Sequence, residues 1–153
     1  MEKELTDVPV IFGHLGGAEA VYARRTTSKG YVPATLARKG GERSNWVTLL
    51  TRDQLRSMDT SEGRCGGWYD LAELSDVRFR VGRKHFTPLY AYVNIANGVM
   101  ALDGRPVSLR SMKQKKAKLM REKSLEMNPA DCLDFNTIPA PNPPARYSQL
   151  VLL

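Results

Sequence analysis

The stretch Ser44-Asn-Trp-Val-Thr-Leu-Leu50, followed by Thr51-Arg-Asp-Gln-Leu-Arg-Ser-Met58, decides the fold class of this chain. The first part is rich in β-branched and aromatic residues, which favour a strand. The second part begins with threonine, a preferred helix N-cap, and Leu50, Leu55 and Met58 fall on one helical face. A strand that leads directly into a short amphipathic helix predicts a domain in which helices pack on a sheet.

Further short strands are predicted on both sides of this unit. They are bounded by glycine or proline and cover residues 8–12, 18–23, 31–36, 68–74, 77–81 and 89–95. A turn is expected at residues 38–43, where Gly40 and Gly41 are adjacent. Tyr90 and Tyr92 are two positions apart and should point to the same side of their strand. The pattern predicts an α+β fold with a curved mixed β-sheet or a small barrel.

The later part of the chain contains two segments of different composition, one basic and one rich in proline. Residues 108–125 show a rough helical stripe of Leu109, Met112, Leu119 and Met120, which predicts a basic helix near the C-terminus. A proline-rich region follows, so we divide the chain into a domain at 1–127 and an extended tail at 128–153. The apolar end of this tail, residues 149–153, is expected to dock on the body or on a partner.

Composition limits the class of protein. The chain has 153 residues, the size of one domain, and ordinary hydrophobic and charged contents of 42% and 25%. It contains no apolar run long enough for a transmembrane helix and no signal-peptide pattern, so we expect a cytoplasmic protein with no membrane association. Cys65 and Cys132 match no metal or redox spacing and are expected to be reduced thiols, with no metal bound.

The positive charge is concentrated in one segment. Residues 110–123 contain seven basic residues against the single acid Glu122, and so hold six of the seven net positive charges. A solvated face is the favoured interpretation, and a surface for phosphate or an acidic partner is the alternative. Because this segment lacks aromatic residues for base stacking, we do not expect nucleic acid as a partner.

Several other side chains are interpreted as structural. Trp46 and Trp68 are expected to pack in the interior, and His14 and His85 show no partner at ligand spacing. A reactive thiol at Cys65, next to an arginine, is a less favoured alternative to a plain cysteine.

The segment Met58-Asp-Thr-Ser-Glu-Gly-Arg-Cys-Gly-Gly-Trp-Tyr69 contains the main candidate for chemistry. Its acid, Glu62, lies in a glycine-flanked turn between the predicted helix and the next predicted strand. Taken alone, Glu62 is a solvated turn residue; a carboxylate fixed beside a cleft would instead be a candidate acid or base.

The order of these motifs resembles the gamma-glutamylcyclotransferase-like family over residues 30–95. The residues that carry the resemblance are Pro33-Ala-Thr-Leu36, Trp46-Val-Thr-Leu-Leu50, Met58-Asp59, Glu62-Gly63, Gly67, Tyr69 and the strand at Tyr90 to Val93. The family's opening Tyr-Gly-Ser-Asn loop has no counterpart here. The chain is therefore either a shortened member or one that uses residues 12–17 in place of that loop.

The resemblance implies a reaction and a set of site residues. It implies that a γ-glutamyl amine or amide cyclises to 5-oxoproline with release of the amine, without metal or cofactor. Glu62 would be the general acid/base, Gly63 and Gly67 would allow close approach of the backbone, and the substrate pocket would be lined by Tyr69, Tyr90 and Tyr92. The alternative is a non-catalytic, degenerate member that acts as a binding or scaffold module. An open sheet edge could also pair with a second copy as a homodimer.

Overall fold

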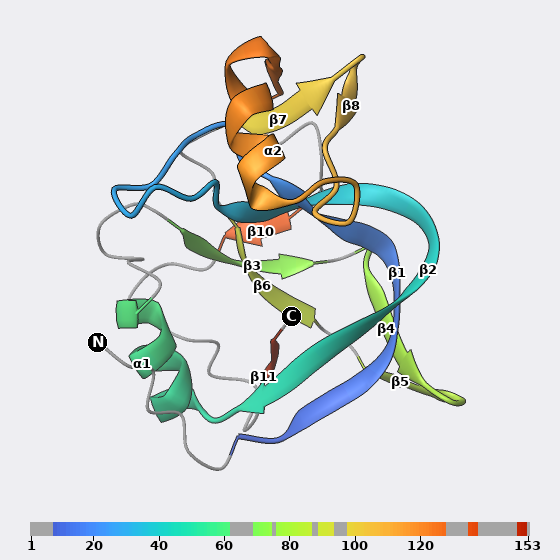
Figure 1. Ribbon diagram of the computed structural model, residues 1–153. Helices are drawn as coiled ribbons and strands as arrows, with labels where there is room; N and C mark the ends of the chain where they lie inside the picture. Colours follow the sequence, from blue (N-terminus) through green and yellow to red (C-terminus); the bar gives the residue numbers. More distant parts are fainter. Residues whose placement is uncertain are drawn as a thin grey trace.

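The fold is built on two long antiparallel strands, β1 (Val10–Tyr22) and β2 (Ala34–Leu50) (Figure 1). The computed structural model describes residues 8–61, 69–74, 76–86, 89–93, 98–127, 135–137 and 150–152. Within these ranges the main sheet has eight strands in the order β10-β3-β6-β11-β2-β1-β4-β5. The remaining bounds are β3 Asp70–Leu74, β4 Arg78–Val81, β5 Lys84–Phe86, β6 Leu89–Val93, β10 Phe135–Thr137 and β11 Leu150–Leu152.

The main sheet is curved and mixed, as the sequence predicted, but the small-barrel alternative is wrong. All neighbouring strands pair antiparallel except β11 and β6, which pair parallel. The described strands at its two ends, β10 and β5, do not pair with each other, so the sheet stays open.

A β-bulge replaces the turn and the strand break that the glycines suggested. The pairing of β1 with β2 moves from Gly16↔Glu42 to Gly17↔Lys39, so that two additional residues, Gly40 and Gly41, are accommodated in β2. Gly17 and Gly41 have φ values of +94° and +79°, a conformation that costs glycine little and other residues more. The predicted strands 8–12 and 18–23 are therefore parts of one strand, and residues 38–43 continue β2.

Helix α1 (Arg52–Ser61) follows β2 without a loop and confirms the prediction for this unit. The Thr51 hydroxyl accepts a hydrogen bond from the Gln54 backbone N–H at 3.3 Å, and the Gln54 side chain accepts one from the Thr51 N–H at 2.9 Å. This reciprocal capping box satisfies donors that the first helical turn leaves free. Leu55 is fully buried with Leu50, Leu71 and Tyr90, which fixes α1 against the sheet.

The segment after residue 127 supplies two strands to the main sheet. β10 pairs with β3, and β11 lies between β2 and β6, with Val151 opposite Leu49 on one side and Leu89 on the other. The apolar end of the chain thus docks on the body, which is one of the two outcomes expected from the sequence.

A second layer covers one end of β1 and β2 (Figure 1). It contains a three-stranded sheet in the order β8-β7-β9 and helix α2 (Gln114–Met120), which continues as a 3-10 turn, η2 (Arg121–Lys123). The strands are β7 Val99–Leu102, β8 Arg105–Pro106 and β9 Leu125–Met127. The predicted helix at 108–125 is therefore much shorter, and Leu119, expected on its buried stripe, is exposed.

Candidate functional site

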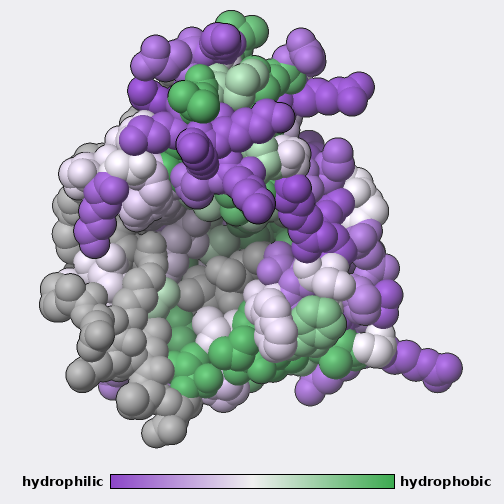
Figure 2. Space-filling model, viewed as in Figure 1, coloured by the Kyte–Doolittle hydropathy of each residue, from purple (hydrophilic) through white to green (hydrophobic). Residues whose placement is uncertain are grey.

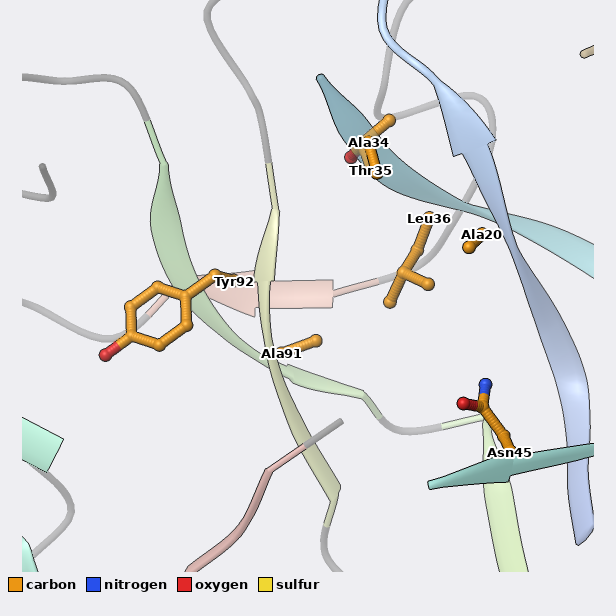
Figure 3. A pocket seen from close by; sticks show the side chains of 7 residues that line it. All are labelled: Ala20, Ala34, Thr35, Leu36, Asn45, Ala91 and Tyr92. Carbon is orange, nitrogen blue, oxygen red and sulfur yellow. The ribbon is translucent and has the colours of Figure 1, made fainter. Parts of the chain in front are cut away.

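A cavity of about 220 Å³ lies between β2 and β6, on the concave side of the curved sheet (Figure 3). Small and apolar side chains form most of its wall, and three polar residues complete it. The lining residues are Ala20, Ala34, Thr35, Leu36, Asn45, Ala91 and Tyr92. A mostly apolar wall with a few polar groups is the composition typical of small-molecule sites, and the volume is smaller than that of most such sites.

Strand alternation explains which side chains reach the cavity. In β2, Asn45 and Val47 face the concave side, where Val47 joins the main core, and Trp46 between them faces outward. Thr35 is only 4% exposed, so its hydroxyl is a buried polar group at the cavity wall. The sequence analysis assigned no role to Asn45 or Thr35; the period-2 pattern around Trp46 was the signal that could have placed Asn45 inward.

Tyr92 connects the cavity to the end of α1. Its hydroxyl donates a hydrogen bond of 2.6 Å to Asp59 Oδ1, and it lies 3.5 Å from the Leu55 carbonyl oxygen. Asp59 is only 7% exposed. In Figure 3 the Tyr92 ring points away from the other labelled side chains. Tyr92 therefore borders the cavity, and its hydroxyl is hydrogen-bonded to Asp59 of α1. Asp59 is a further residue that sequence reasoning quoted as a motif without a role.

Tyr69 lies on the opposite flank of the candidate catalytic segment. Its hydroxyl donates a hydrogen bond of 3.0 Å to the carbonyl oxygen of Ala34, which lines the cavity. Tyr69 is therefore placed at the cavity rim by a contact with β2.

Tyr90 has a different position from the other two tyrosines. It shares the α1-facing side of β6 with Tyr92, as the two-residue spacing predicted, and it is 1% exposed among Leu50, Leu55 and Leu71. Its ring is part of the packing under α1, and Ala91, between the two tyrosines, is the β6 residue that faces the cavity.

The expected acid/base Glu62 and the glycines Gly63 and Gly67 lie outside the described residues, as do Cys65, Trp68 and Cys132. Ser61, the last residue of α1, directly precedes the segment 62–68, and Tyr69 is the first described residue after it.

In the described part of the chain, no three His, Cys, Asp or Glu side chains are grouped so that they could hold a metal ion. None of the described helices has the length and apolar character needed to cross a membrane. Among the described residues, Glu42 has a pKa below its usual value, chiefly because Arg80 donates a 2.7 Å hydrogen bond to its carboxylate.

The basic segment forms a shallow hollow on the second layer. Its wall is formed by Lys115, Lys118, Leu119, Arg121, Glu122 and Lys123. Figure 2 shows hydrophilic side chains gathered over this end of the molecule, which fits the interpretation of a solvated face.

Comparison of the chain with protein-family models, curated protein sequences and solved structures gave no match in any of the three. The residues and the geometry described above are therefore the basis for assigning a function.

Proposed function

We propose that this chain is a gamma-glutamylcyclotransferase-like enzyme, in which a γ-glutamyl amine or amide enters the cavity between β2 and β6 and cyclises to 5-oxoproline. Glu62 acts as the general acid/base. The gamma-glutamylcyclotransferase-like fold, as a finer description of the α+β architecture, is part of the same proposal.

One observation carries the proposal: both ends of the segment that contains Glu62 are tied to the cavity wall. At one end, Asp59 receives the 2.6 Å hydrogen bond from Tyr92, a lining residue, and Glu62 follows only three positions later. At the other end, Tyr69 is hydrogen-bonded to Ala34, also a lining residue. These two contacts support the proposal that Glu62 reaches a substrate bound in the cavity, as a general acid/base must.

The reaction requires little beyond positioning and proton transfer. The α-amine of the substrate attacks its own γ-carbonyl carbon, a C–N bond forms in the new five-membered ring, and the bond from that carbon to the leaving nitrogen breaks. Glu62 accepts a proton from the attacking nitrogen and delivers it to the leaving nitrogen, so one carboxylate serves both steps. The cavity favours the bent conformer, and this raises the rate because nucleophile and electrophile are in the same molecule.

The lining chemistry fits a small polar substrate. The Asn45 side-chain oxygen already accepts a 2.8 Å hydrogen bond from the Trp46 N–H, so Asn45 would offer its NH₂ group to a polar group of a γ-glutamyl moiety. Ala20, Leu36 and Ala91 would exclude water from the methylene carbons of that moiety. These contacts are part of the proposal.

The test is release of 5-oxoproline from a panel of γ-glutamyl amines and γ-glutamyl amino acids. Glu62→Gln should abolish release without changing the unfolding transition. Glu122→Gln is the matched control, since it makes the same change in an exposed acid of η2. Activity that survives Glu62→Gln would contradict the assigned role, and a folded chain inactive on every substrate would reject the enzyme proposal.

The second candidate function is a non-catalytic binding module. The observation in its favour is an exposed aromatic pair on the convex side of the sheet, away from the cavity. An inactive protein with a specific ligand for that surface would support this alternative.

A further inference from the structure

An aromatic pair stands exposed on the outer face of β1 and β2. Phe12 and Trp46 are directly opposite each other in the two strands, with ring centroids 4.9 Å apart. Their exposed fractions are 49% and 57%, although large aromatic side chains usually avoid this degree of exposure. Val10, two residues before Phe12 and on the same face, is also exposed, so the apolar surface is continuous.

The sequence interpretation of Trp46 as an interior residue is therefore wrong. The concave positions of β2 at this level are occupied by Asn45 and Val47, and alternation leaves Trp46 on the convex side. The second layer covers the other end of β1 and β2, where it pairs at Val21↔Ser108 and Ala23↔Val99. In Figure 2 hydrophobic side chains gather at the end of the molecule opposite the second layer, and others lie among the hydrophilic side chains of that layer.

A row of two histidines and one arginine borders the aromatic pair. His14 follows Phe12 on the same face, Arg80 lies opposite His14, and His85 lies opposite Arg80. Rows on one face of a sheet are roughly 7 Å apart, so this row is the direct neighbour of the aromatic row. We name the surface of Phe12, Trp46, His14, Arg80 and His85 the convex face.

Two further arginines lie beside the convex face. Arg78 lies one row beyond Arg80, opposite Gly16, and the Arg110 guanidinium reaches the face from another part of the chain, where it donates a 2.7 Å hydrogen bond to the Ser44 carbonyl oxygen. The acid in these rows is Glu42, and its charge is already paired with Arg80. The convex face is therefore complementary to an anionic ligand, not to a cationic or a neutral apolar one.

We propose that the convex face binds single-stranded nucleic acid. An exposed Trp–Phe pair can stack with bases of any sequence, and the guanidinium groups of Arg78 and Arg110 beside it can contact the adjoining phosphates. Together these are the two components of single-strand recognition. The expectation against nucleic acid rested on the lack of aromatic residues in the basic segment 110–123. The structure places the aromatic residues on a different element, next to different cations.

The experiment measures binding of the full chain to short labelled oligothymidylate and oligouridylate by fluorescence anisotropy, with quenching of tryptophan emission as a second readout. We expect binding at low salt that weakens as salt increases, as counterion release requires. Trp46→Ala and Phe12→Ala should each weaken it by about 5- to 100-fold, the range for the loss of one base stack. Trp46→Phe, which keeps a stacking ring, should retain most of the affinity and lose the quenching.

Two variants that each remove one positive charge distinguish binding at the convex face from general attraction to a basic protein. Arg78→Ala should reduce affinity and lower the slope of log K against log salt by about 0.7, and Lys115→Ala on α2 should change neither. Unaltered unfolding transitions would show that the exposed substitutions leave the fold intact. Comparison of the two oligonucleotides, which differ in the sugar and in the C5-methyl group of the base, shows whether the chain prefers the DNA or the RNA probe.

Three results would overturn the proposal. One is no binding of either oligonucleotide at low salt. Another is binding that Trp46→Ala leaves unchanged or that Lys115→Ala weakens as much as Arg78→Ala, because either would indicate non-specific charge. The third is a concentration-dependent dimer that Trp46→Ala dissociates, without oligonucleotide binding, which would make the convex face a contact between two copies.

Discussion

The Tyr92 hydroxyl lies 2.6 Å from Oδ1 of Asp59, so that a strand residue at the cavity holds the last turn of α1. Asp59 is the buried acid of the helix, and Tyr92 is partly buried. A hydrogen bond in such surroundings costs more to break than a surface contact, because the partner left behind has lost its water. The contact therefore sets the point from which the chain continues into the proposed catalytic segment.

Tyr92→Phe should lower the free energy of unfolding by about 1–3 kcal/mol, since it removes one donor from a buried carboxylate. Urea denaturation is the measurement, and Tyr31→Phe, which removes the same atom from an exposed tyrosine, is the control. If the cyclotransferase proposal is correct, Tyr92→Phe should also lower kcat more than it changes KM. Equal stabilities of the Tyr92 and Tyr31 variants would mean that the Asp59 contact contributes nothing.

Gly13→Ala should destabilise the fold by about 1–3 kcal/mol through overpacking. A Cβ at this position would lie 2.5 Å from the Arg80 carbonyl oxygen and 2.7 Å from Phe79 Cζ, and neither the backbone nor a buried ring can yield easily. Gly40→Ala is the matched control, because a Cβ there meets no atom within 4 Å. A similar shift of the thermal midpoint in both variants would show that β1 and β4 are not packed this closely.

The carboxyl of Glu42 should titrate below its usual pKa of 4.5, mainly because of the hydrogen bond from Arg80. A lowered folded-state pKa means that the interaction stabilises the fold above pH 4.5 and that this contribution is lost as the pH falls through the lowered value. The effect on stability should be small, as for other exposed pairs, and weaker at high salt. NMR titration of the Glu42 carboxyl is the measurement.

Arg80→Gln should return the pKa of Glu42 toward its usual value, whereas Arg83→Gln, at an exposed position in the β4–β5 turn, should leave it nearly unchanged. An unaltered titration in the Arg80 variant would disprove the ion pair.

Val151→Pro should destabilise the protein by about 3 kcal/mol or more, because β11 lies between two strands and proline cannot donate to a ladder. Val151→Ile keeps the backbone N–H and is the control. Hydrogen exchange should show faster opening of β2 and β6 in the proline variant. Protection equal to that of the unmodified chain in both strands would mean that β11 is not held between them.

Sequence reasoning succeeded where the signal is local. The capping box of Thr51 and Gln54 and the apolar face of Leu50 and Leu55 are written within a few residues, so α1 was predicted with its correct N-terminus. The Asp103-Gly104 pair is also a local signal: both residues have positive φ, and they form the turn between β7 and β8. That hairpin was missed although its turn residues were present in the sequence.

The errors have a common cause, which is that pairing is decided between distant residues. Gly40 and Gly41 permit positive φ, but whether they form a turn or a bulge depends on the register with Gly16 and Gly17 in another strand. The direction in which Trp46 points depends on which face of β2 the rest of the sheet curls over. The cavity could not be predicted for the same reason, because Thr35, Asn45 and Ala91 meet only after β2 and β6 are brought together.

The central place of β11 has a consequence for how the protein is made. β2 and β6 are joined through residues 150–152, and β2 begins at residue 34. The β1–β2 hairpin can form early during synthesis, but the two halves of the main sheet cannot be joined in their final order until residue 152 has been added. Contacts of such long sequence separation slow folding, and until then the facing edges of β2 and β6 offer unpaired backbone groups to other chains. The period between synthesis of the hairpin and arrival of its last neighbour is therefore when this protein is most open to aggregation.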